Sequence, residues 1–400
     1  MTHLPLRGPG RRLLGVAAVA AASVLLFTGC TTDAAGGGST VAAGDLGFLT
    51  QQQYDTISTT LAAASAIPDE KVPTDTIDVS KLAGQKVLVM PSASFLTDCD
   101  TISKQMVDQL GKLGMSGTYF QTDGTTASWV SGMQQAISQG YNAIVLLCGI
   151  DPDLVSTQVQ EATSKGIVVS AGALYDNTED GGRINKLIQA QTNSPLYTSI
   201  QATALQAIMD HRDAPFDALM LTADEVASSA VMKKAITDAF STYCPQCNIT
   251  TVNVPLADVS TKMTPAVQSA LVANSKIKAV MPLYGGTDTT YAAAAITAVN
   301  KSDVGTYGSY GMPIADIQQM GTPGNHLMAV TRHNNMLRMV TTLDQTLRAM
   351  AGMKTVDPNV YVDPNRLVTP ANAAKFLAVS NEGFGDDVVN QYLALWGQKK

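Results

Sequence analysis

The chain has 400 residues, of which 45% are hydrophobic and only 15% are charged. A chain of this length and composition is expected to form two or three domains with a sizeable core, which excludes a disordered polymer. Its net charge of −7 excludes the basic surface that is typical of nucleic-acid-binding proteins.

The first 29 residues have the pattern of a secretory signal. Three arginines precede an apolar run from Leu13 to Phe27, which is shorter than the roughly 20 residues of a membrane-spanning helix. The run ends in Thr28-Gly29-Cys30, and this junction resembles the bacterial lipobox, in which the cysteine is lipidated and becomes the new N-terminus. We therefore predict an extracytoplasmic protein that is anchored to the cell membrane by lipid on Cys30. An ordinary signal with a chance cysteine is the alternative.

Cleavage before Cys30 would leave 23 basic and 33 acidic residues, a net charge of −10. An acidic chain gains no attraction to an anionic membrane surface, so the lipid would have to hold it there.

Four cysteines follow Cys30, and an even number in an exported chain suggests disulfides. Cys244 and Cys247 flank a Pro-Gln turn and are predicted to pair locally. Half a zinc site is the alternative, although no second CxxC or histidine pair accompanies it. Cys99 and Cys148 follow the first and third predicted strands, which are neighbours in doubly wound sheets. We predict that they pair, with two free thiols as the alternative.

Regular alternation of strands and helices begins after a Gly- and Ala-rich tether (34–47), a short helix (51–66) and a polar connector. Strands are expected at 86–90, 117–121, 142–147, 167–171 and 186–190, and the helices between them at 101–113, 126–139 and 153–165. A second set follows, with strands at 216–221, 248–254, 277–283 and 327–331 and helices at 196–211, 228–242, 263–273, 288–299 and 335–350. The tail contains an extended segment at 366–370 and a last helix at 386–396.

Strands that are apolar on both faces and separated by helices indicate a parallel sheet that is covered by helices. The two sets, joined near Gln191 and again near Thr331, predict an α/β fold of two doubly wound lobes with a cleft at the carboxyl ends of the strands. The predicted division is a signal peptide (1–29), a lipid-anchored linker with the N-terminal helix (30–81), an N-terminal lobe (82–191 plus 333–362) and a C-terminal lobe (192–332 plus 363–400).

The order of elements between about 85 and 369 resembles the periplasmic binding proteins of the ribose- and galactose-binding type, the solute receptors of ABC importers. The most specific stretches are Gly140 to Leu154, with its apolar strand and Asp151-Pro152-Asp153, and Glu161 to Val169, with Lys165-Gly166-Ile167. The resemblance implies a type 1 periplasmic-binding-protein-like fold and a hinge that closes on a small polar ligand, nominally a sugar. It also implies delivery to an ABC permease by a monomer without a cofactor.

The expected pocket departs from the sugar-binding pattern of that family. Its members typically have Asp-Arg after the fourth strand, Asn-Asp after the strand that holds Leu283, and Asp in a Gly-x-Asp-Gly turn. This chain has Ala171-Gly-Ala173, Tyr284-Gly-Gly286 and Tyr310 at these places. The loss of carboxylates favours, as an alternative to a sugar, an aromatic or amphipathic ligand with an anionic group that faces Arg332.

The candidate ligand-binding residues lie at the cleft edge of the predicted sheets: Phe95, Asp98, Cys148, Asp151, Tyr284, Tyr310 and Arg332. Five of them have a second interpretation. Phe95 is equally consistent with loop packing, Asp151 with the start of a helix, and Tyr284 and Tyr310 with the core. Arg332 would either meet the ligand or pair with a carboxylate such as Asp224 and hold the closed form.

Other functions have less support in the sequence. A sensor that presents its ligand to a membrane receptor would use the same closed shape as an importer component. A transcriptional regulator on this fold would need a DNA-binding helix pair in place of the export signal. The histidines show no metal-ligand spacing, and no nucleophile elbow, P-loop or GxGxxG motif occurs, so we predict neither an enzyme nor a metal site.

Overall fold

A computed structural model describes residues 45–178, 182–226, 228–309 and 311–398. The predicted signal peptide, the predicted lipidation site at Cys30 and the candidate Tyr310 lie outside these residues. Within the described part of the chain, no helix is both long and apolar enough to cross a membrane.

The first lobe is built on a five-stranded parallel sheet in the order β2-β1-β3-β4-β5. Its strands are β1 (Lys86–Pro91), β2 (Ser116–Tyr119), β3 (Ala143–Leu147), β4 (Val168–Ala171) and β5 (Ala190–Gln191). Consecutive residues point to opposite faces of a strand, and every residue of β3 is buried. The sheet is therefore covered on both sides, as the apolar runs predicted.

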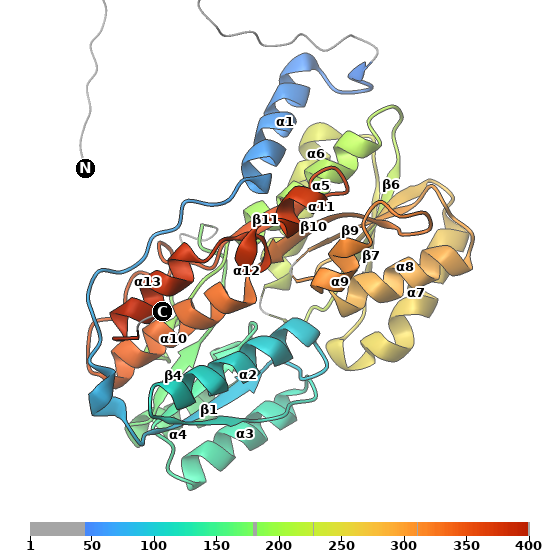
Figure 1. Cartoon of the computed structure of the whole chain (residues 1–400). Helices are drawn as coiled ribbons and strands as arrows, with labels where there is room; N and C mark the ends of the chain where they lie inside the picture. Colours follow the sequence, from blue (N-terminus) through green and yellow to red (C-terminus); the bar gives the residue numbers. More distant parts are fainter. Residues whose placement is uncertain (1–44, 179–181, 227, 310, 399–400) are drawn as a thin grey trace, which may run out of the picture. The chain divides into compact units, whose positions relative to one another are not determined.

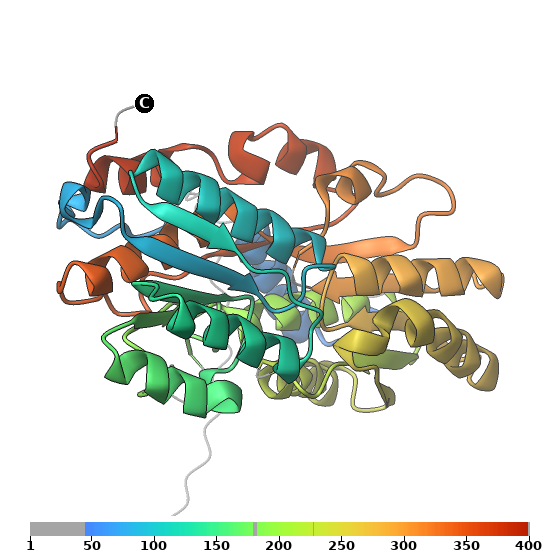
Figure 2. The ribbon, with the colours of Figure 1, turned by 90° about the horizontal axis from the view of Figure 1, so that it is seen from below.

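Helices cover each face of this sheet, and Figure 2 shows α2 and α3 on opposite sides of β1. Val87 and Val89 of β1 join a cluster with α2 (Thr97–Lys112) and α10 (Asn335–Met350). The alternate residues of β1 join a second cluster with α3 (Thr126–Ser138) and α4 (Ser156–Ser164). Successive side chains of the strand, which point to opposite faces, thus pack against two separate layers of helices.

The second lobe has a six-stranded sheet in the order β11-β10-β9-β8-β6-β7, parallel except for β11. Its strands are β6 (Asp217–Thr222), β7 (Ile249–Asn253), β8 (Ile277–Pro282), β9 (Gly305–Ser309), β10 (Leu327–His333) and β11 (Asn365–Val368). Helices α5 (Leu196–Asp210) and α6 (Ser229–Tyr243) cover one face. Helices α7 (Val259–Ala273) and α8 (Thr287–Ala298) cover the other.

The chain passes between the two sheets three times: from β5 to α5, from β10 to α10, and from α10 to β11 (Figure 1). The first two crossings lie where the sequence placed them. The two-lobed α/β fold predicted from the alternating pattern is confirmed.

Two strand predictions fail in informative ways. The expected strand at 186–190 is reduced to Ala190–Gln191, because Asn185 bends the preceding segment by accepting a hydrogen bond from the Leu187 backbone N–H at 2.8 Å. Strand β9 was missed because it contains Gly305 and Gly308. Glycine is needed there for close packing, since a Cβ on Gly308 would lie 2.5 Å from Thr289 Oγ1.

The segments outside the two α/β sets pack on both lobes. Helix α1 (Gln51–Ser65), close to the predicted 51–66, lies against α5 and β11 of the second lobe, and the chain then reaches the first lobe, where the Ile77 backbone N–H donates to Leu395 O. The sequence placed residues 363–400 together in the C-terminal lobe. Strand β11 lies there, but α13 (Asp387–Leu395) packs instead against α10 of the first lobe, because its apolar side chains complete the core around that helix.

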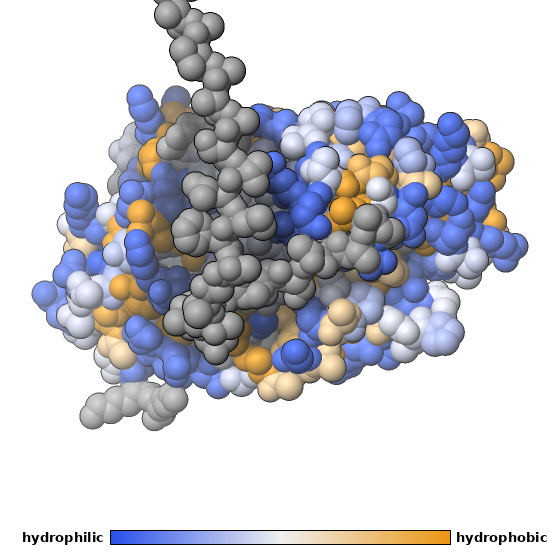
Figure 3. Space-filling view, turned by 90° about the horizontal axis from the view of Figure 1, so that it is seen from above, coloured by the Kyte–Doolittle hydropathy of each residue, from blue (hydrophilic) through white to orange (hydrophobic). Residues whose placement is uncertain are grey.

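The part of the face in Figure 3 that is not covered by grey atoms is mostly hydrophilic, and its apolar residues lie in small separate groups. Such scattered apolar residues are normal on a water-exposed surface.

Candidate ligand-binding site

A cavity lies between the lobes at the carboxyl ends of the strands. Its volume, traced by the centre of a water molecule, is about 70 Å³, several times what a single water needs. The first lobe contributes Ser92, Leu96, Thr97, Asp98, Cys99, Cys148, Gly149 and Ala173 to its wall. The second lobe and the crossings contribute Leu196, Val226, Ser228, Leu256, Tyr284, Gly285, Gly286, Thr287, Gly311, Pro313, His333 and Arg338.

The lobes approach each other closely around this cavity. A Cβ on Gly149 would lie 3.7 Å from Val226 Cγ1 across the cleft, and a Cβ on Gly124 would lie 3.7 Å from Leu256 Cβ. A methyl group added at either glycine would thus be in ordinary van der Waals contact with the other lobe, so the backbone of each glycine lies close to that lobe. The structure therefore shows a closed arrangement, in which side chains of both lobes face one small space.

The predicted disulfide between Cys99 and Cys148 is present and forms part of the wall, with 6.1 Å between the two Cα atoms. Helix α2 begins at Thr97, four residues earlier than expected, so that Asp98 and Cys99 lie in its first turn rather than in a loop. The predicted local pair of Cys244 and Cys247 is also present, and the zinc alternative finds no support. No group of three metal-ligating side chains occurs among the described residues.

Two wall residues have a backbone conformation that is unusual for their type. Cys148 and Ala173 follow β3 and β4 with φ angles of 61° and 54°. A non-glycine residue in the left-handed region costs about 1–3 kcal/mol, and such residues cluster at functional sites. The Ala173 backbone N–H donates to Thr192 Oγ1 at 3.0 Å, so the first crossing helps to hold this conformation.

Arg332 does not line the cavity. It is 1% exposed, and its Nη1 donates to Asp98 Oδ2 at 2.9 Å while its Nη2 donates to Glu382 Oε2 at 2.8 Å. Asp98 also accepts from Asn335 Nδ2 at 3.1 Å. Arg332 therefore pairs with carboxylates, the second of its two interpretations, but the partner named for it was wrong because Asp224 pairs with Lys233.

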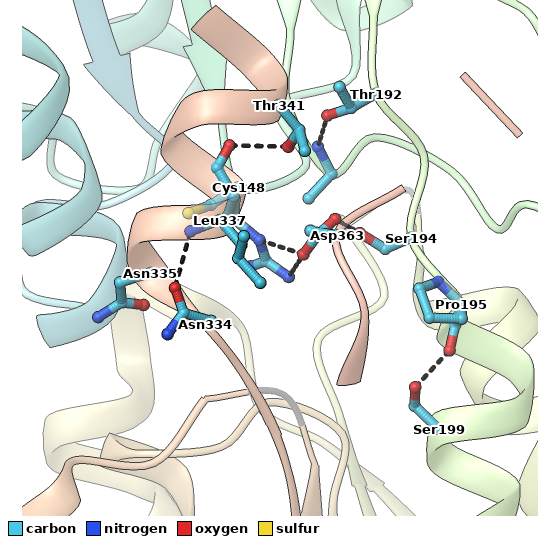
Figure 4. Close-up of polar contacts among 12 residues, drawn as sticks. Cys148, Thr192, Ser194, Pro195, Ser199, Asn334, Asn335, Leu337, Thr341 and Asp363 are labelled. Atoms are coloured by element: carbon cyan, nitrogen blue, oxygen red, sulfur yellow. Dashed lines mark hydrogen bonds and ion pairs between the residues drawn. The ribbon is translucent and has the colours of Figure 1, made fainter. Parts of the chain in front are cut away.

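A second buried ion pair connects the crossings (Figure 4). Asp363, on the third crossing, accepts from Arg338 Nε at 2.6 Å and from Ser194 Oγ at 2.5 Å. Arg338 lies on α10, directly after the second crossing, and Ser194 lies on the first. The three crossings are thus joined at one carboxylate, and the Arg338 side chain also reaches the cavity wall.

His333 ends β10 and lines the cavity. Burial lowers the pKa of His333 well below its ordinary value, and the charges of Arg338 and Arg332 lower it further. The imidazole is therefore neutral at physiological pH.

On the second-lobe side, Tyr284 lines the cavity, and a buried acid follows the wall residue Thr287 in the chain. The Tyr284 hydroxyl lies 3.0 Å from Ser228 Oγ and 2.7 Å from Ser229 Oγ. Asp288, in the first turn of α8, is 3% exposed. Burial, with the nearby charge of Glu225, raises the pKa of Asp288 to about 8, so this carboxyl is largely protonated at neutral pH.

Three of the candidates named from the sequence meet in this cavity: Asp98, Cys148 and Tyr284. Phe95 is 43% exposed and lies outside the wall. Asp151 lies outside it too, because it caps the following turn by accepting from the Asp153 backbone N–H at 3.1 Å.

Sequence reasoning missed several wall residues, among them Leu256, His333 and Arg338. Leu256 and Arg338 had no signal, because helical or apolar residues are read as core. His333 had a weak signal, since it stands at the end of a predicted strand where the chain leaves the sheet.

No protein-family model matches the chain, and no curated protein matches its sequence. Solved structures do match its fold. An ABC transporter solute-binding protein from Agrobacterium vitis with bound allitol has 16% identity and a TM-score of 0.64, covering 74% of this chain and 98% of its own. A sugar ABC transporter protein from Yersinia enterocolitica has 18% identity and a TM-score of 0.64, covering 82% and 99%.

A third neighbour is the 5-methylthioribose transporter solute-binding protein of Thermotoga lettingae, in complex with 5-methylthioribose. It has 15% identity and a TM-score of 0.62, covering 82% of this chain and 96% of its own. The structural neighbours are thus ABC transporter solute-binding proteins. The chain has the type 1 periplasmic-binding-protein fold, two parallel-sheet α/β lobes that face a common cavity.

Proposed function

We propose that this protein is the extracytoplasmic solute-binding component of an ABC importer. It captures a small polar organic ligand, nominally a sugar, in the cavity between its lobes and delivers it to a membrane permease. The observation that carries this proposal is the wall itself, which takes side chains from both lobes. A ligand that contacts both lobes stabilises the closed state over the open one, as hinge closure requires.

The structural neighbours also support the proposed binding of a small molecule. Two of them hold allitol and 5-methylthioribose as bound ligands, both small, uncharged and hydroxylated. At 15–18% identity they share the fold with this chain, so the ligand is a proposal that rests on the cavity. Ligand capture and lobe closure require neither a nucleophile nor a metal. A binding role therefore accounts for the site without catalysis.

A thermal-shift screen across monosaccharides, polyols, nucleosides and aromatic acids tests the proposal. A ligand at a hundredfold excess over its Kd stabilises the folded protein by about 2.7 kcal/mol. Small-angle scattering should then show that the protein becomes more compact when the same compound is added. If no small molecule in the screen raises the melting temperature, the receptor function is contradicted.

We further propose that lipid on Cys30 anchors the protein to the outer face of the cell membrane. The Cys30→Ser variant should be released into the medium or the soluble fraction, whereas retention on membranes would contradict the lipid anchor. A sensor that presents its ligand to a signalling receptor remains the second candidate. Co-purification of the full chain from membranes separates the two, because an importer component brings down a permease and a sensor brings down a receptor.

A further inference from the structure

We propose that the ligand of this cavity is uncharged and amphipathic, a deoxygenated or alkylated polyol rather than a fully hydroxylated sugar or an acid. The inference rests on the proposed binding function and narrows its ligand class. It also replaces the anionic ligand that the position of Arg332 suggested from the sequence.

The charges of the wall are few and paired. Among its described residues only Asp98 and Arg338 carry a charge at neutral pH, and each is matched within the protein. Asp98 accepts from Arg332 at 2.9 Å and from Asn335 at 3.1 Å. Arg338 donates to Asp363 at 2.6 Å, and Asp363 is fully buried.

The pairing of the wall charges disfavours a charged ligand. A charged ligand would lose its hydration on entering the closed cavity, and no unmatched counter-charge among the described wall residues would replace it. Beside the cavity, His333 is neutral and Asp288 is largely protonated, and the charged Glu225 accepts from the Leu256 backbone N–H at 2.6 Å. The cavity therefore selects against anions, and its wall offers a cation no unmatched carboxylate.

Much of the wall is apolar. Leu96 and the Cys99–Cys148 disulfide face the cavity from the first lobe, and Leu196, Val226 and Leu256 face it from the second lobe. Leu256, which is 3% exposed, closes the space beside Gly124. Both halves of the cavity thus present hydrocarbon or sulfur to the ligand, and a ligand with hydroxyl groups in every direction would leave some of them without partners.

Another part of the wall is polar. Ser92, Thr97, Ser228 and Thr287 bring hydroxyl-bearing side chains to the wall. A hydroxyl group both donates and accepts hydrogen bonds, so it suits neutral hydroxyl or carbonyl groups of a ligand. The few polar groups would fix the orientation of a ligand whose remaining surface is apolar.

The test uses matched trios of compounds that differ at one terminal carbon, which bears a methyl, hydroxymethyl or carboxylate group. D-fucose, D-galactose and D-galacturonate form one trio, and quinovose, D-glucose and D-glucuronate form another. Isothermal titration of the purified protein should show that the methyl member of a binding trio has a Kd at least about 10-fold lower than the hydroxymethyl member. The carboxylate member should not bind.

Each other outcome overturns the proposal. Equal or tighter binding of the hydroxymethyl member, or any comparable binding of the acid, contradicts an uncharged amphipathic ligand. Failure of all methyl members to bind also contradicts the ligand class. In that case a positive result for any other compound in the wider thermal-shift screen would leave the proposed receptor function standing.

Wall variants assign the preference to the apolar side chains. Leu256→Ala should raise the Kd of the methyl member about 10-fold or more while changing that of the hydroxymethyl member less. Val226→Ala provides a second wall variant in case the first does not fold. Leu154→Ala is the control, because Leu154 is 48% exposed on the first lobe, outside the wall. Equal losses for both ligands in the wall variants would contradict the assignment.

Discussion

At the scale of single residues, the structure assigns Arg332 a role between the lobes. Arg332 stands on β10 of the second sheet, whereas Asp98 stands on α2 of the first lobe, so their ion pair connects the lobes beside the second crossing. The second carboxylate, that of Glu382, also accepts from the Asn335 backbone N–H at 3.2 Å. One guanidinium thus joins carboxylates from two distant segments to the second crossing.

Replacing Arg332 by Ala should lower the free energy of unfolding by about 3–5 kcal/mol, because two carboxylates lose their partner in a largely buried site. Urea unfolding measures the effect. Arg183→Ala is a suitable control, since its pair with Asp153 is about half exposed and should contribute at most about 1 kcal/mol. Similar values for the two variants would contradict a structural role for Arg332.

The buried Asp288 predicts that the stability of the folded protein depends on pH. Its carboxyl has a pKa near 3.8 in the unfolded chain and about 8 in the folded protein, so the folded state binds more protons between these values. Its contribution to stability is therefore greatest at low pH and is lost as pH rises from about 4 to about 8.

Asp288→Asn should remove this dependence. The melting temperature of the variant should rise relative to that of the unmodified protein between pH 5 and pH 8, by at least about 2 °C. Asp387→Asn, at an exposed position on α13, is the control. A difference that stays constant across this pH range would show that Asp288 is ionised in the folded protein.

At the scale of elements, helix α1 behaves as part of the second lobe rather than as a tether. Ile57 is fully buried, and Ile57 and Leu61 pack with the apolar face of α5. The helix also starts with a capping box, in which Thr50 and Gln53 satisfy each other's backbone N–H groups. Its position is therefore specified both locally and by packing.

Ile57→Ala should destabilise the protein by about 2–5 kcal/mol, the usual cost of emptying a buried isoleucine site. Chemical unfolding would show this. Val272→Ala on α7, where the side chain is 74% exposed, should change stability by no more than about 0.5 kcal/mol. A negligible effect of Ile57→Ala would mean that α1 is dispensable for the lobe.

At the scale of the whole molecule, the two disulfides should contribute unequally. Cys99 and Cys148 are separated by 49 residues and Cys244 and Cys247 by 3. A cross-link that closes a longer loop removes more conformational entropy from the unfolded chain, which gives about 4 kcal/mol for the first bond and roughly 2 kcal/mol for the second.

Urea unfolding of the two double Cys→Ser variants compares these values. Only the double variant that lacks Cys99 and Cys148 should also bind the ligand more weakly, because only the Cys99–Cys148 disulfide lines the cavity. Equal loss of binding in both variants would indicate a global rather than a local effect.

The two α/β lobes follow from the sequence because their signals are local, whereas the place of α13 on the first lobe does not. Apolar runs such as Ala143–Leu147, separated by amphipathic helices, suffice to predict covered parallel sheets. The pairing of Cys99 with Cys148 was predicted for the same reason, since strand order places the ends of the first and third strands side by side.

The composition of the site depended on tertiary structure. Whether Arg332 faces a ligand or a carboxylate is decided by Asp98 and Glu382, which lie 234 and 50 residues away in the chain. Leu256 and Arg338 have ordinary core and helix patterns, and only the meeting of two lobes brings them to one cavity. Local periodicity thus determined the lobes, whereas the charge and polarity of the space between them were decided by long-range contacts that no local pattern records.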